Sequence, residues 1–346
     1  MNYKKIVLFS FVAVLLCFQH VPARQAGQAD ARKAAGPVYI APQVAAVIDA
    51  GVAQRLTRAD IPLNYARTYY LPAQQNQIYP IFIFKIKNAD LNLAAAPESP
   101  EVLRAKFHVF TRLYRLENGA LGAVVRERYI PFNPEENKAT FQPAAENYYS
   151  IASEIYPAGN YLLALAISTP DFSRISVTYI DVSLPDVALL QSKLEATPVF
   201  SVTGLQQMPA ADARITIHKN SFVYNTLLLS PSIGNEFKAN ESLDLFYFVL
   251  GARPDAASNA FDLQITYKFK KDGKELRKLG PAQVKNIIIS QPISLSYAEI
   301  TKDAQGVETE RKQVTLEPGD YTLEIEMLDS VSKAAGKQEF RFKIVI

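Results

Sequence analysis

Strict alternation of apolar and polar residues over positions 261–270 constrains the fold of this chain more than any other feature. Every odd-numbered residue in this segment is apolar and every even-numbered residue is polar. Successive side chains of a β-strand point to opposite faces, so the segment is predicted to form a strand with one buried and one solvated face. The pair Asp272 and Gly273 follows, and it favours the tight turn of a β-hairpin.

The composition extends this prediction to the whole chain. The 346 residues include 19 Phe and 18 Tyr, and 49% are apolar, which excludes a disordered chain and suffices for one large core or two ordinary ones. The 21 prolines fall between strand-like runs, so long helices are not expected. The sequence therefore predicts an all-β protein. Residues 38–56 leave open a short helix or a covering strand, and residues 186–196 show a helical pattern.

The N-terminus has the features of an export signal. Two lysines precede an apolar run over residues 6–18, and Ala23 ends a short segment of the kind that signal peptidase cleaves. The sequence predicts a cleaved signal peptide over residues 1–23 and a protein exported to the periplasm, the cell surface or the medium. The run is shorter than the roughly 20 residues of a bilayer span, so no transmembrane segment is expected in the mature chain. A retained anchor and lipidation at Cys17 are the alternatives.

Cleavage changes the chemistry that the chain can offer. It removes the only cysteine, and two of the 37 basic residues, which leaves 35 against 34 acidic residues and a formal charge of +1. The mature chain then has no thiol for catalysis, a disulfide or a metal site. A nearly neutral chain also lacks the basic footprint of nucleic-acid binding, so no nucleic-acid partner is expected. Residues 24–58 are predicted to form a flexible leader and a covering segment.

An internal duplication organises the rest of the chain. Tyr161 and Tyr321 each follow a Pro/Gly turn and an Asn or Asp, and each opens an apolar strand. From Ile81, in the first strongly apolar strand, to Tyr161 is 80 residues, and from Leu243, in its counterpart, to Tyr321 is 78 residues. This matched spacing predicts two copies of one fold unit.

The turn before each tyrosine resembles the tyrosine corner of Greek-key β-sandwiches, in which the hydroxyl bonds back to the preceding backbone. The resemblance implies two tandem immunoglobulin-like sandwiches, over residues 59–185 and 198–346, joined by a linker at 186–197. The chain has no Trp, and the cysteines of antibody-type domains are absent. The resemblance is therefore one of fold, and it carries no function.

The sequence lacks the common catalytic motifs. No zinc-protease, nucleophile-elbow, phosphate-loop or dinucleotide motif occurs, and neither His108 nor His218 has a second ligand at metal-binding spacing. The pairs Glu135/Glu136 and Glu308/Glu310 are predicted to be solvated loop charges. The oxygen-rich loop at 255–262 and the lysines of 267–278 are also interpreted as structural. No catalytic residue, cofactor or metal is expected.

Two predicted strands are apolar on both faces, over residues 161–167 and 243–250. A sandwich strand needs only one buried face, so something must cover the second. Either another part of the chain covers it, such as 38–56 or 186–207, or a partner does, with the tyrosines at 69–70 and 148–149 adding to that surface. The residues proposed for such an interface are Phe246, Phe248, Leu250 and Leu162.

Taken together, the duplicated sandwich and the missing catalytic motifs predict a non-enzymatic, exported binding or structural module with a protein or glycan partner in the cell envelope. The alternative is a carbohydrate-directed protein, either a binding accessory module or a hydrolase. A hydrolase would need two carboxylates facing each other across a cleft.

Overall fold

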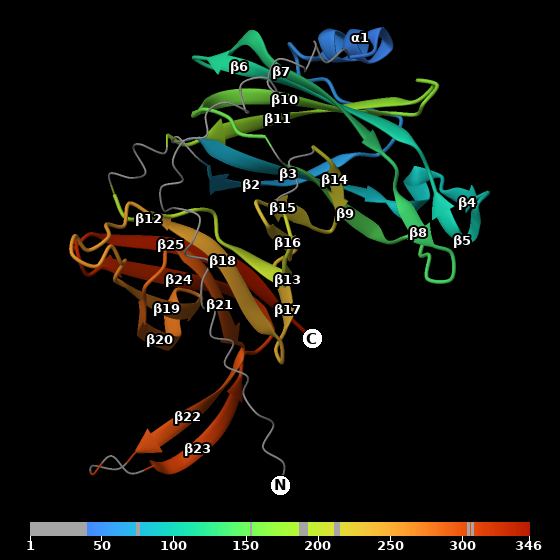
Figure 1. Ribbon diagram of the computed structural model, residues 1–346. Coiled ribbons are helices and arrows are strands. Elements are labelled where there is room, and N and C mark those ends of the chain that lie inside the picture. The colour runs from blue at the N-terminus through green and yellow to red at the C-terminus, as the bar shows by residue number, and fades with distance from the viewer. Residues whose placement is uncertain are drawn as a thin grey trace. The chain divides into compact units, whose positions relative to one another are not determined.

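The computed structural model describes residues 40–73, 77–152, 154–186, 193–210, 215–302, 305 and 308–346. Strands dominate this part of the chain, and α1 (Pro42–Gly51) is its only α-helix (Figure 1). The prediction of an all-β protein is confirmed. No helix in the described residues is long and apolar enough to cross a membrane.

A first pair of antiparallel sheets encloses one apolar core, which includes Phe84, Tyr149 and Leu163. We call the larger sheet the β10 sheet; its strands in order are β1 (Arg58–Ala59), β11 (Ile175–Leu184), β10 (Gly159–Ser168), β6 (Phe107–Glu117) and β7 (Ala120–Phe132). We call the facing sheet the β3 sheet; its strands in order are β14 (Ile217–Lys219), β9 (Glu146–Ile151), β3 (Ile78–Lys87) and β2 (Asn64–Pro72).

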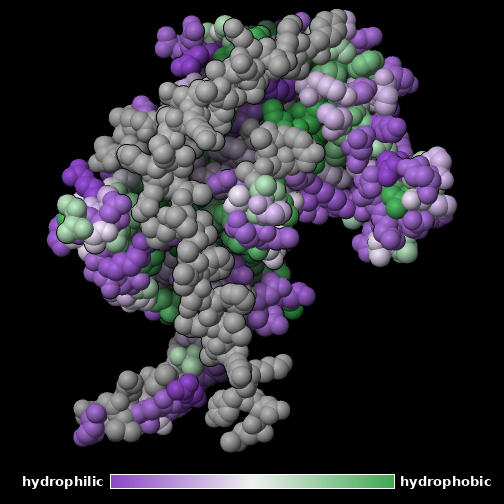
Figure 2. Space-filling view, in the orientation of Figure 1, coloured by the Kyte–Doolittle hydropathy of each residue, from purple (hydrophilic) through white to green (hydrophobic). Residues whose placement is uncertain are grey.

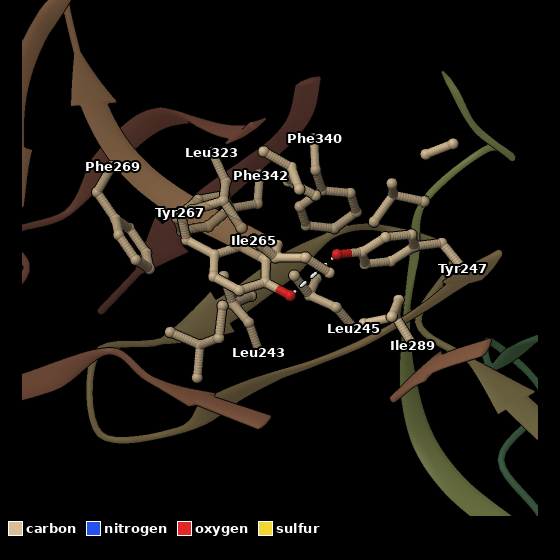
Figure 3. Packing of buried hydrophobic residues seen from close by; sticks show 14 of the residues in the cluster. Leu243, Leu245, Tyr247, Ile265, Tyr267, Phe269, Ile289, Leu323, Phe340 and Phe342 are labelled. Atoms are coloured by element: carbon tan, nitrogen blue, oxygen red, sulfur yellow. Dashed lines mark hydrogen bonds between the residues drawn. The ribbon is translucent and has the colours of Figure 1, made fainter. Parts of the chain in front are cut away.

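A second pair of sheets encloses a separate core. We call the first the β24 sheet; its order is β17 (Glu236–Lys238), β25 (Ala335–Val345), β24 (Gly319–Asp329), β19 (Leu263–Lys271) and β20 (Lys274–Val284). We call the second the β18 sheet; its order is β12 (Glu195–Ala196), β18 (Ser242–Leu250), β13 (Phe200–Gln207), β16 (Leu227–Pro231) and β15 (Phe222–Tyr224), and β21 (Ile288–Ser294) also pairs with β18. Leu243 and Leu245 of β18 pack here against Ile265 of β19 (Figure 3).

Short elements complete the described fold. A small sheet contains β4 (Ala94–Ala96), β5 (Ser99–Arg104) and β8 (Glu135–Asn137), and a 3-10 helix, η2 (Asn88–Leu91), follows β3. A separate hairpin contains β22 (Ser296–Lys302) and β23 (Glu308–Thr315). Hydrophilic side chains make up most of the coloured surface of this hairpin (Figure 2).

The alternating segment and its turn fold as the sequence predicted. β19 spans Leu263–Lys271, and Asp272 and Gly273 have φ values of 52° and 76° before β20 begins. Positive φ at both positions is the requirement of a type I′ hairpin turn, which Asp-Gly meets at low cost.

The undecided segment 38–56 contains helix α1. Pro42 stands at its first turn, where a missing N–H costs nothing, and Val44 and Ile48 share one face at a spacing of four residues. Both are fully buried against the outer face of the β10 sheet, where Leu162, Ala164 and other apolar residues lie. For the helical pattern at 186–196, residues 187–192 lie outside the described residues, and Glu195 and Ala196 form strand β12.

The two predicted sandwich regions share structure. Strand β14, which the sequence analysis placed in the second region, pairs with β9 and extends the β3 sheet. A third apolar cluster, with Tyr69 and Ile81 on one side and Phe200 and Phe246 on the other, joins the outer faces of the β3 and β18 sheets. A boundary at residue 198 therefore does not separate two independent packing units.

Candidate functional site

The two tyrosines singled out by the sequence hold equivalent turns. The hydroxyl of Tyr161 donates to the carbonyl of Pro157 at 2.9 Å, and that of Tyr321 donates to the carbonyl of Glu317 at 2.8 Å. Both rings are buried. A cation lies near each ring: the Arg115 guanidinium is 5.6 Å from the centroid of Tyr161, and Lys271 Nζ is 5.4 Å from that of Tyr321. Each hydroxyl thus fixes the turn that opens β10 or β24.

The residues proposed as a partner interface lie inside the chain. Phe246, Phe248 and Leu250 are at most 8% exposed and belong to the cluster between the β3 and β18 sheets. Leu162 is 1% exposed and packs beneath α1. These four side chains form no free surface, so the interface prediction is corrected: the chain covers the second face of both strands itself.

The histidines are held by neighbouring side chains. His108 Nδ1 lies 2.9 Å from the Tyr129 hydroxyl, and its ring stacks on Phe172. His218 Nε2 lies 2.9 Å from Thr216 Oγ1. The described residues include no group of three or more His, Cys, Asp or Glu that could hold a metal ion.

Several acidic residues have structural partners. Glu136 was expected to be a solvated loop charge, but its side chain is only 14% exposed, and it accepts hydrogen bonds from Asn147 and from Lys219 of β14. In the oxygen-rich loop, Asp255 Oδ1 accepts the backbone N–H groups of Ser258 and Ala257 and the hydroxyl of Ser258. These hydrogen bonds lower the pKa of Asp255 and use its carboxylate to shape the loop.

A cleft of about 440 Å³ is the best candidate for a functional site. Its residues come from β3 and β9 of the β3 sheet, from the turn between β14 and β15, from β13, and from the stretch that runs from the end of β16 to the start of β17. Ile83 and Ile233 contribute aliphatic surface, and Tyr148 contributes a half-buried aromatic ring. We call it the seam cleft, because its walls come from both predicted sandwich regions.

Backbone geometry positions the polar side chains of the seam cleft. Asn220 has a φ of 53°, a left-handed conformation that Asn tolerates better than most residues. Its backbone N–H donates to the carbonyl of Tyr148 at 2.7 Å, and its Oδ1 accepts the N–H of Tyr148 at 3.0 Å. The hydroxyl of Ser150 donates to the carbonyl of Ser221 at 2.6 Å. The turn before β15 is therefore fixed against β9.

Among the described residues, some of the charged side chains around the seam cleft are paired, and one is not. Lys85 Nζ lies 2.8 Å from Glu146 Oε2, and this hydrogen bond raises the pKa of Lys85. Glu236 is exposed, and no side-chain hydrogen bond or ion pair holds its carboxylate within the described structure. The unpaired charge on the wall of the seam cleft is therefore negative.

A second, wider cavity of about 850 Å³ shares Gly234 and Glu236 with the seam cleft. It reaches Arg67 of β2 and Tyr321 of β24. The segment that begins β17 thus has a cavity on each side. This arrangement gives an elongated ligand room to extend beyond the seam cleft.

The sequence indicated two residues of the seam cleft, the aromatic pair Tyr148 and Tyr149. Asn220, Ser232 and Glu236 carry no motif and come from separate elements. Asn220 carried one further signal, because Asn tolerates a positive φ. That signal predicts a turn rather than a ligand site.

Comparison with known proteins adds little to this geometry. No family model matches the chain, and no curated protein matches it. Among solved structures, the C-terminal domain of the antigen I/II-family protein AspA of Streptococcus pyogenes matches 82% of this chain and 99% of its own. That match has 9% sequence identity and a TM-score of 0.20, which is too weak to transfer a fold or a function.

Proposed function

We propose that this chain is an exported, non-enzymatic binding module built from two tandem immunoglobulin-like sandwiches, and that the seam cleft is its ligand site. The observation that carries the proposal is the origin of the seam cleft, whose walls combine β9 with β13 and the β16–β17 segment. Ligand sites are commonly concave and lie between packed units, with a few fixed polar groups on an apolar surface.

The tandem sandwich is supported by repeated strand order. The path β11-β10-β6-β7 recurs as β25-β24-β19-β20, and Tyr161 and Tyr321 make the same backbone hydrogen bond at the start of β10 and β24. Export is supported by the lysines, apolar run and cleavage segment of residues 1–23. N-terminal sequencing of the exported protein is expected to begin at Arg24.

Two carboxylates line the seam cleft, as a carbohydrate hydrolase would require, but their settings support binding. Glu146 is committed to Lys85, and Glu236 is exposed, whereas a general acid usually needs an environment that favours its protonated form. If the ligand is a carbohydrate, the seam cleft is therefore better suited to binding it than to hydrolysing it.

Gly234 allows a direct test of the seam cleft. A Cβ at Gly234 would meet no other heavy atom nearer than 4.0 Å, so Gly234→Trp is expected to fold while filling the seam cleft, and Gly234→Ala is the matched control. The exported form of each variant is immobilised and exposed to fractionated cell-envelope extract. The wild type and Gly234→Ala are expected to retain one component that Gly234→Trp loses. Equal retention by all three, or by none, would contradict the proposal.

A further inference from the structure

We infer that the seam cleft takes a neutral oligosaccharide. This inference rests on the proposed function and adds the chemical class of the ligand. Three features carry it: unused hydrogen-bonding groups, the sign of the unpaired charge, and an aromatic ring beside aliphatic surface.

The seam cleft contains hydrogen-bonding groups that the fold does not use. The Tyr148 hydroxyl, the Asn220 Nδ2, the Ser232 hydroxyl and the Glu236 carboxylate have no hydrogen-bond partner among the described residues. Asn220 is informative, because its Oδ1 is fixed by the N–H of Tyr148 and its amide group is left with donors only. Together these groups offer both donors and acceptors, which a ligand rich in hydroxyl groups can satisfy at once.

The charges of the seam cleft disfavour an anionic ligand. Lys85 is paired with Glu146, and Lys219, on the neighbouring strand β14, is paired with Glu136. The remaining free charge is the carboxylate of Glu236, which repels anions and accepts hydrogen bonds from hydroxyl groups. A phosphate, sulfate or uronic-acid group would therefore be disfavoured in the seam cleft itself.

The apolar surface suits the C–H face of a sugar ring. Tyr148 is half-buried, which limits the entropy that its ring loses on binding. Ile83 and Ile233 line the same cleft with little exposed area, at 2% and 8%. The cavity of about 440 Å³ falls within the roughly 300–1,000 Å³ of small-molecule sites. The adjoining cavity beyond Gly234 accommodates further sugar units.

A peptide fits the seam cleft less well. Extended peptides bind most often by adding a strand to an open sheet edge. Ile83 of β3 and Ser150 of β9 each have a pairing partner on both sides, so this wall of the seam cleft offers side chains and no free strand edge.

The test uses the exported form, residues 24–346, on a printed array with neutral, uronic-acid and sulfated oligosaccharides, followed by calorimetry with the best ligand. Neutral oligosaccharides are expected to bind and the anionic ones not to bind. Tyr148→Ala is expected to weaken binding about tenfold or more, through loss of the ring. Tyr148→Phe and Glu236→Gln are each expected to weaken it about two- to tenfold, through loss of one hydrogen bond.

Tyr129→Ala is the control, since Tyr129 is an exposed tyrosine on β7 outside the seam cleft, and it is expected to leave binding unchanged. Glu236 is exposed, so its substitution tests the site even if Tyr148→Ala fails to fold. The inference is overturned if no neutral oligosaccharide binds, if anionic ones bind better, or if Gly234→Trp and Glu236→Gln bind as the wild type does. One result would reject the inference and leave the proposed function standing. In that result the wild type retains a protein that Gly234→Trp does not retain, and no oligosaccharide binds.

Discussion

The β10 sheet and the β24 sheet share a strand order but differ completely on their outer faces. When Tyr161 is aligned with Tyr321, the outward positions Ala164 and Ala166 of β10 correspond to Glu324 and Glu326 of β24. The alanines are fully buried under α1. Glu324 instead binds two lysines of its own sheet, Lys270 at 2.8 Å and Lys337 at 2.7 Å.

This difference shows that one topology tolerates two solutions for the same face. The outer face of the β10 sheet removes apolar area from water by recruiting a helix, which contributes about 25 cal/mol for each Å² buried. The outer face of the β24 sheet satisfies the charge of Glu324 within the sheet. Small residues at Ala164 and Ala166 allow α1 to approach the strands closely.

Ala166→Glu places on the covered face of the β10 sheet the residue type that β24 has at the equivalent position. It should lower stability more than the other substitutions below. Ala166 lies between Phe110 and Val177 in the sheet, so a carboxylate there has no cation in register. A buried, unpaired charge is expected to lower the free energy of unfolding by about 3–5 kcal/mol, or to release α1. Urea denaturation measures the first outcome and hydrogen exchange of α1 the second. Unchanged stability with α1 still protected would show that the face is not sealed.

Ile48→Ala weakens the packing of α1 on the β10 sheet by changing the helix instead of the sheet. Ile48 is fully buried on the face of α1 that packs on the β10 sheet, and the cavity left by its side chain is expected to cost about 2–4 kcal/mol. Ala46→Ser, on the exposed side of the same helix, is the control and should change stability by less than about 0.5 kcal/mol. Equal effects of the two substitutions would mean that α1 does not dock through this side.

Tyr161→Phe and Tyr321→Phe compare the two sheets where they are most alike. Each substitution removes one hydroxyl hydrogen bond to a backbone carbonyl, so each is expected to cost about 1 kcal/mol in thermal or urea unfolding. The two effects should agree with each other. A large loss for one tyrosine and none for the other would break the equivalence of β10 and β24.

Acid titration should weaken the outer face of the β24 sheet. Hydrogen bonds from Lys270 and Lys337 lower the pKa of Glu324 below its ordinary value of 4.5. Its stabilising contribution is therefore complete above that value and is lost as the pH falls through the lower folded-state pKa. Glu324→Gln is expected to flatten the acid side of the stability curve, which urea denaturation over a pH series measures.

The sequence predicted the local features of the fold well. The alternation at 261–270 and the Asp272–Gly273 turn depend on neighbouring residues alone, and both appear in β19 and its hairpin. Helix α1 could not be assigned, because its buried face becomes recognisable only against the β10 sheet. The cover over Phe246 and Phe248 likewise involves β2 and β3, which lie far earlier in the chain.

The candidate site was less accessible to sequence reasoning. Its polar groups come from separate strands and turns, and each is an ordinary surface residue in its own segment. Only pairing of β14 with β9 brings Asn220 to Tyr148, and only the start of β17 brings Glu236 to the same cleft. Periodicity and spacing in the sequence do not predict such long-range pairing.

Strand β14 has a practical consequence for dissecting the protein. A fragment that ends after Leu184 would lose the strand that closes one edge of β9 and would expose the apolar outer side of β2 and β3 to solvent. Open edges and large apolar patches drive aggregation, so this fragment is expected to be insoluble. The complementary fragment from Val199 would carry β14 with no partner. The two predicted sandwich regions thus depend on each other, and a soluble truncation is expected to need Ile217–Lys219 together with β9.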